Sequence, residues 1–228
     1  MNKTARIAGL WYLLMAITAP IGLLYVPSKL IVPGNPAATA GNIAGAELLF
    51  RFGIASSLVC QIAFVFLVFT LYRLFKDVHQ PSAALMVGLV VASVPIAILN
   101  VLNSLAVLVL LDKTNPLTAL GPDQMNALIT VFLSLQDQGT ALSEIFWGLW
   151  LFPFGMLTFK SGFLPKTLGI LLLLAGIGYL THAACFILFP IAAGVVGTIV
   201  SIPEGIGEIS MVLWLLIRGT NRSGMAAA

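Results

Sequence analysis

The chain has 228 residues, of which 60% are hydrophobic and only 8% are charged. Soluble domains carry about 25% charged residues, so this composition excludes an ordinary soluble protein and predicts an all-α, polytopic membrane protein. The net charge of +3 does not indicate nucleic-acid binding, because the basic residues lie beside the predicted spans, where they set the orientation of the chain.

Six segments are apolar and long enough to cross a membrane, by the rule that about 20 apolar residues span the hydrocarbon core. Their predicted ranges are 7–26, 48–75, 83–111, 140–159, 168–188 and 199–217. In the first span, Trp11, Tyr12 and Tyr25 occupy positions typical of aromatic side chains at the membrane–water interface, and Pro20 predicts a kink. We expect loops at residues 27–46 and 190–198, and a disordered tail at 219–228.

A further helix, over about residues 122–135, is predicted from apolar side chains that recur at helical spacing: Met125, Leu128, Ile129, Phe132 and Leu135. The opposite face is polar, so this amphipathic helix is expected to lie along the membrane interface. A break at Gly139 should separate it from the fourth span. The sequence therefore predicts one membrane domain, residues 1–228, built as a six-transmembrane-helix bundle with an additional amphipathic interfacial helix.

The basic residues indicate which way the chain crosses the membrane. Eight of the eleven fall on one side of the six-span arrangement: Lys3, Arg6, Arg73, Lys76, Lys160, Lys166, Arg218 and Arg222. Only Lys29, Arg51 and Lys113 fall on the other side. Because basic residues concentrate on the cytoplasmic side of membrane proteins, both termini are predicted to be cytoplasmic.

The polar focus of the sequence is residues 201–210, SIPEGIGEIS, at the start of the last span. Glu204 and Glu208 are four residues apart, which places both carboxylates on one helix face with their Cβ atoms roughly 5–6 Å apart. A charged side chain at the centre of a membrane helix costs about 2.5–3.5 kcal/mol on insertion scales. Both glutamates should therefore face protein, water, a metal ion or a cationic partner.

Other polar side chains are predicted at a similar depth in the outer half of the membrane. Glu144 lies about one turn inside the fourth span, and His182 lies about six residues from the outer end of the fifth. Arg51, Asn100 and Asn103 occupy the outer half of the second and third spans, which makes them candidate ligand contacts.

We predict that four residues share one outward-opening cavity: Glu144, His182, Glu204 and Glu208. As metal ligands they would suit Zn, Fe or Mn, and an open coordination position would allow hydrolysis by an activated water. Without a metal they would bind a small molecule, a lipid, an ion or a proton. As interhelical contacts they would belong to a structural or accessory subunit. The sequence leaves these interpretations open, and with them whether the protein is an enzyme or holds a cofactor.

Four stretches of the chain resemble a known bacterial family: KTARIAGLWYLLMAITAPIGLLYVP, FRFGIASSLV, LYRLFKDV and FWGLWLFPFGMLTFKSGFLPKTLGILLLLAGIGYL. On these stretches the chain is similar to the six-span integral membrane proteins catalogued as domain of unknown function 4386. The resemblance implies a location in the bacterial inner membrane, with the lipid bilayer as a partner, and it implies no activity. A small-molecule or lipid ligand and a homodimer are further expectations from the residues themselves.

Overall fold

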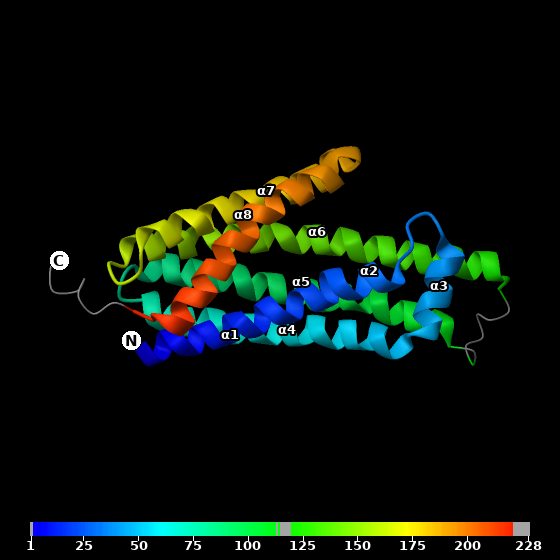
Figure 1. Cartoon of the computed structure of the whole chain (residues 1–228), viewed down its shortest axis with the longest axis horizontal. Helices are drawn as coiled ribbons and strands as arrows, with labels where there is room; N and C mark the ends of the chain where they lie inside the picture. Colours follow the sequence, from blue (N-terminus) through cyan, green and yellow to red (C-terminus); the bar gives the residue numbers. More distant parts are fainter. Residues whose placement is uncertain (1, 113, 115–119, 221–228) are drawn as a thin grey trace. The chain divides into compact units, whose positions relative to one another are not determined.

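The computed structural model describes residues 2–112, 114 and 120–220. This part of the chain is helical and contains no strand (Figure 1). Its helices are α1 (Asn2–Pro20), α2 (Val26–Leu30), α3 (Pro36–Gly45), α4 (Glu47–Phe75), α5 (Gln80–Leu111), α6 (Pro122–Lys160), α7 (Lys166–Leu188) and α8 (Pro190–Ile217), with a π-helical segment η1 (Ile21–Tyr25) between α1 and α2. The all-α prediction is confirmed.

Six helical stretches among the described residues are long and apolar enough to cross a membrane: Asn2–Leu30, Glu47–Phe75, Gln80–Leu111, Pro122–Lys160, Lys166–Leu188 and Pro190–Ile217. Each overlaps one of the six predicted spans. The class of polytopic helical membrane protein is therefore confirmed, and its apolar helices contact the lipid bilayer. Residues 221–228 of the predicted tail lie outside the described residues.

The disturbance predicted at Pro20 is a widened turn in the helix. The π-helical segment η1 follows Pro20 directly, and the backbone N–H of Val26 donates to the carbonyl oxygen of Ile21, five residues earlier. Proline lacks an N–H and its ring clashes with the carbonyl of the preceding turn. A π-bulge is one way for a helix to absorb that clash while the chain continues.

Two segments predicted as loops contain helix instead. Helix α3 lies within residues 27–46, and the side-chain oxygen of Asn35 caps it by accepting from the N–H of Ala38 at 3.0 Å. Residues 190–198 form the first turns of α8, which has Pro190 in its first turn. Both corrections have the same cause, because proline breaks a helix in its interior but suits its first turn.

The break predicted at Gly139 is wrong, because α6, which is 39 residues long, continues through this position. At 1.5 Å per residue its length is about 58 Å, and the predicted helix 122–135 is its first part. The apolar stripe of that part packs on protein. Ile129 is only 1% exposed, and three further stripe residues lie against the same hydrophobic cluster: Met125, Leu128 and Phe132. Buried protein surface thus accounts for most of a stripe that the sequence assigned to the membrane interface.

The chain forms two compact units, each assembled from separate segments. Unit 1 comprises Met1–Leu14, Ala63–Pro95 and Ala141–Ala228, and unit 2 comprises Met15–Ile62 and Ile96–Thr140. Long helices contribute to both, so that α6 begins in unit 2 and ends in unit 1. The single membrane domain over residues 1–228 stays a prediction.

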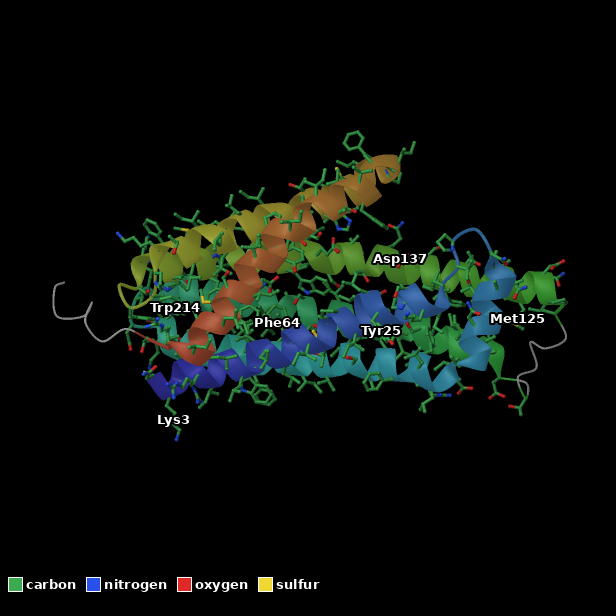
Figure 2. All side chains as sticks on the ribbon, viewed as in Figure 1. Lys3, Tyr25, Phe64, Met125, Asp137 and Trp214 are labelled. Atoms are coloured by element: carbon green, nitrogen blue, oxygen red, sulfur yellow. The ribbon has the colours of Figure 1, made fainter. Side chains whose placement is uncertain are left out.

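Unit 2 has a mainly aliphatic core, formed by Val26, Leu30, Ala40, Ile43, Phe50, Val107, Leu108, Leu110 and Ile129. The core of unit 1 contains packed aromatic rings in addition to aliphatic side chains. The rings of Trp150 and Phe154 stack with centroids 5.2 Å apart, and Phe64, labelled in Figure 2, packs edge-on against Trp150 at 4.9 Å. Such offset and edge-on pairs add to the stabilisation that burial of the rings provides.

Glycines bring α6 and α7 into close contact within unit 1. A Cβ atom at Gly148 would lie 2.9 Å from the carbonyl oxygen of Gly176, and one at Gly155 would lie 2.8 Å from that of Gly169. In each helix the two glycines are seven residues apart, which places them on one face two turns from each other. Helices α7 and α8 are joined at Phe189 and pack against each other (Figure 1). Three consecutive helices therefore lie close enough to share one site.

Candidate functional site

Glu208 of α8 joins three helices of unit 1 through its carboxylate. The Tyr12 hydroxyl of α1 donates to Oε2 at 2.8 Å, and the Tyr179 hydroxyl of α7 donates to Oε1 at 2.7 Å. The interfacial role predicted for Tyr12 is wrong, because its side chain is fully buried and its hydroxyl is bound to Glu208. Both carboxylate oxygens of Glu208 therefore have a hydrogen-bond donor from the protein.

Glu144 and His182 form a second polar contact in the same unit. The Oε2 atom of Glu144 on α6 lies 2.7 Å from Nδ1 of His182 on α7, and the two side chains are 13% and 26% exposed. The imidazole also lies against α8, because a Cβ atom at Gly197 would be 2.7 Å from Nε2. A glycine at position 197 leaves the space that the histidine ring occupies.

Glu204 lies beside these two groups and differs from them. Its Oε1 atom is buried and has no hydrogen-bond partner among the described residues, and a Cβ atom at Gly178 of α7 would lie 3.0 Å from it. The carboxylates of Glu144 and Glu208 are near enough to interact with Glu204 electrostatically. No described Lys or Arg forms an ion pair with any of the three. A buried acceptor without a donor is costly, so Glu204 is the incomplete member of the cluster.

Aromatic side chains also contribute to this site. Tyr179 lies within electrostatic range of all three carboxylates, and its ring packs edge-on against Trp147 with centroids 6.4 Å apart. Sequence reasoning missed Tyr12 and Tyr179 as members of the site. The spacing could have indicated Tyr179, because it lies three residues before His182 and therefore on the same face of α7. We call Glu144, Tyr179, His182, Glu204 and Glu208, together with Tyr12, the acidic cluster.

The other three predicted site residues belong to unit 2. Arg51 pairs with Glu47 one turn earlier, Nε to Oε1 at 2.7 Å, and the two side chains are 55% and 53% exposed. The Asn103 side-chain amide donates to Oδ1 of Asn100 at 2.9 Å. The structure therefore places Glu144, His182, Glu204 and Glu208 near one another in unit 1, and Arg51, Asn100 and Asn103 in the other unit. An outward-opening cavity shared by the four residues stays a prediction.

Asn100 is the centre of a neutral polar network in unit 2. Its side-chain amide donates to the carbonyl oxygen of Gln136 at 2.8 Å and to the hydroxyl of Thr140 at 3.3 Å. The Ser104 hydroxyl donates to the side-chain oxygen of Gln136. A Cβ atom at Gly139 would overlap the Asn100 amide, so this glycine allows α5 and α6 to approach closely. The residue that the sequence suggested as a helix break thus serves helix packing.

Among the described residues, no group of three or more His, Cys, Asp or Glu side chains has the arrangement needed to hold a metal ion. Glu144 and His182 are in contact, whereas both oxygens of Glu208 already accept from tyrosines. A Zn, Fe or Mn site at Glu144, His182, Glu204 and Glu208 stays a prediction, and these side chains would have to rearrange to form it.

The fold and the acidic cluster define a polytopic helical membrane protein with ionisable groups between its helices. The chain belongs to the family described as Domain of unknown function (DUF4386), whose model matches residues 7–219, and the resemblance noted from the sequence is confirmed. A relative from Archaeoglobus fulgidus, named "Uncharacterized protein", is 35% identical over 96 residues, which are 42% of this chain and 52% of the relative. The chain thus matches about half the length of that curated relative. No solved structure matches it.

Proposed function

We propose that the protein binds a small protonated amine between the helices of unit 1, with Glu204 as its principal anionic contact. One observation carries this proposal: the buried Oε1 of Glu204 has no hydrogen-bond donor among the described residues. Glu208 is bound by two tyrosines and Glu144 by His182, so Glu204 is the buried glutamate best suited to a ligand that brings its own N–H.

The chemistry around Glu204 favours a cation over a neutral or anionic ligand. Glu144 and Glu208 place two further carboxyl groups near it, and no described Lys or Arg forms an ion pair with any of the three. The rings of Tyr179 and Trp147 are adjacent, and aromatic faces attract cations by about 0.5–2 kcal/mol. Ionisable residues inside a membrane protein generally mark a ligand or ion pathway.

We infer that this site faces the outside of a bacterial inner membrane, with both termini in the cytoplasm. Seven of the eight basic residues predicted to be cytoplasmic belong to the described part of unit 1, and the eighth, Arg222, lies outside the described residues. Lys113, which is predicted to be on the other side, also lies outside them. Glu208 lies ten residues before Arg218, or about 15 Å along the helix, which is near the middle of a hydrocarbon core about 30 Å thick. Glu144 lies 16 residues before Lys160, about 24 Å along α6.

Thiol labelling of intact cells tests this orientation. A cysteine at Asn35, just before α3, should react with a membrane-impermeant thiol reagent, whereas cysteines at Gln80 and Ser161 should be protected until the cells are opened. Thr118, a second site expected to be external, lies outside the described residues. Labelling of Gln80 and Ser161 in sealed cells would reverse the orientation.

Equilibrium binding to the purified full chain tests the function itself, with three probes of similar shape. Benzylamine carries a positive charge and N–H donors, benzyltrimethylammonium carries the charge alone, and benzyl alcohol is neutral. We expect affinity to fall in that order, and Glu204→Gln to weaken benzylamine by at least about tenfold, the loss of one charged hydrogen bond of 1.5–3 kcal/mol. Glu47→Gln, which alters an exposed acid in unit 2, should bind like the wild type.

The same preparations separate the remaining interpretations. Equal affinity for all three probes would contradict the amine proposal. Stoichiometric Zn, Fe or Mn that disappears in both Glu204→Gln and His182→Ala would instead support a metal-dependent membrane enzyme. Absence of any binding, with only the stability of the variants changed, would support a structural or accessory subunit.

A further inference from the structure

A second polar feature of unit 1 lies at the beginning of α1, away from the acidic cluster. A concavity of about 290 Å³ runs along one face of the helix and is lined by Asn2, Lys3, Arg6, Ile7 and Leu10. Polar and basic side chains line it at positions 2, 3 and 6, and aliphatic side chains line it at positions 7 and 10. The cavity therefore changes from cationic to apolar along the helix.

The cationic end has unused charge and unused donors. Lys3 and Arg6 are exposed, and within the described chain neither forms an ion pair; Figure 2 shows the Lys3 side chain extending away from α1. The Asn2 side-chain oxygen accepts from the N–H of Thr220 at 3.2 Å, and its side-chain NH₂ group is a potential donor to an anion. The amino end of a helix adds a partial positive charge. This end of the concavity suits a phosphate group.

The apolar end distinguishes a lipid from a free anion. Ile7 and Leu10 are 39% and 59% exposed, and each lies about one turn beyond a basic residue, Ile7 after Lys3 and Leu10 after Arg6. A free phosphate would neutralise the charges and leave both side chains uncovered. An acyl chain would cover them, and each buried CH₂ group contributes about 0.8 kcal/mol.

We propose that this concavity binds an anionic phospholipid of the leaflet nearest the chain's N-terminus. Its phosphate contacts Lys3 and Arg6, and an acyl chain follows Ile7 and Leu10. Basic pockets at the edge of membrane helices are suited to anionic headgroups. The inference rests on α1 alone and does not depend on the amine site.

The test uses the full chain, freed of lipid in detergent, and short-chain phosphatidylglycerol as the probe. We expect it to bind more tightly than short-chain phosphatidylcholine, and Lys3→Gln with Arg6→Gln to weaken it roughly 30-fold, as two surface charges should. The matched control is Arg73→Gln with Lys76→Gln, which removes two exposed basic residues at the same spacing from the same unit. The control should retain wild-type affinity.

A charge-preserving exchange separates binding from folding. Lys3→Arg with Arg6→Lys should bind phosphatidylglycerol like the wild type, even if the neutral double variant folds poorly. Three results would overturn the proposal: equal affinity for the two lipids, an equal loss in the Arg73 and Lys76 control, or inorganic phosphate that competes at the affinity of the lipid. The last would assign the concavity to a free anion.

Discussion

The two units differ in the kind of polar side chain that they place between their helices. In unit 2 the central contacts are neutral, because Asn100 donates to Gln136 and Thr140 and accepts from Asn103. In unit 1 they are ionisable, and one of them, the Oε1 atom of Glu204, has no partner in the described chain. A network whose members bind one another is explained by helix packing. A carboxylate oxygen without a donor in its network is an acceptor for the ligand that we propose.

The energetic cost sharpens this contrast. Interhelical hydrogen bonds between neutral groups in membranes contribute only about 0.6 kcal/mol on average. Unit 2 therefore gains a modest stabilisation from groups that cost little to bury. A carboxylate inside the membrane costs several times more to place there. If helix packing were the only requirement, neutral amide side chains would suffice in unit 1 as they do in unit 2. The three glutamates are therefore the residues for which a function should be sought.

The largest expected effect is the loss of Glu208. Glu208→Ala removes the acceptor of two tyrosine hydroxyls, one of them on the fully buried Tyr12. It should lower the free energy of unfolding by about 2–4 kcal/mol, because each donor left without a partner costs roughly 1–3 kcal/mol. Unfolding in mixed detergent measures this loss. Glu47→Ala, at an exposed ion pair of unit 2, should cost no more than about 1 kcal/mol, and an equal loss in both variants would refute the special status of Glu208.

The contact between α6 and α7 gives the next largest effect. Gly176→Ala would place a Cβ atom 2.9 Å from the carbonyl oxygen of Gly148, and overpacking of this kind costs about 1–3 kcal/mol. Gly194→Ala in α8 is the matched control, because nothing lies within 4 Å of its Cβ position. That variant should be as stable as the wild type or slightly more stable. Thermal unfolding compares the two, and an undisturbed Gly176→Ala protein would contradict the close packing of these helices.

Asn100→Ala tests whether the network of unit 2 is only structural. The change removes the donor to Gln136 and Thr140 and should cost about 0.6–1.7 kcal/mol, the range of such contacts in membranes. The affinity for benzylamine should not change. A loss of amine binding that exceeds the loss of stability would remove the distinction between the units.

Gly197→Ala should have the smallest effect on stability and a specific effect on the site. Its Cβ atom would reach within 2.7 Å of Nε2 of His182, so the ring must move and its contact with Glu144 must change. We expect benzylamine affinity to fall a few-fold, an effect of about 1 kcal/mol, while Gly194→Ala leaves it unchanged. Wild-type affinity in Gly197→Ala would show that the position of His182 is unimportant for binding.

Much of the fold could be predicted from the sequence because lipid imposes a simple rule on composition and length. All six spans and the convergence of Glu144, His182, Glu204 and Glu208 follow from that rule and from the need of each glutamate to avoid lipid. Gly139 and Pro190 misled the prediction, because a glycine can be required by a close neighbour and a proline can begin a helix. The partners of Glu208 could not be predicted, since Tyr12 is 196 residues away in the chain and its partner depends on how α1 and α8 pack.

The most direct test of the central claim is an infrared difference spectrum of the full chain with and without benzylamine. We expect a change in a carboxylate band on binding, present in the wild type and in Glu47→Gln and absent in Glu204→Gln, because the proposed amine donates to the buried oxygen of Glu204. A carboxylate signal of the same size in Glu204→Gln would contradict binding at Glu204, since the amine would then be bound by another acid.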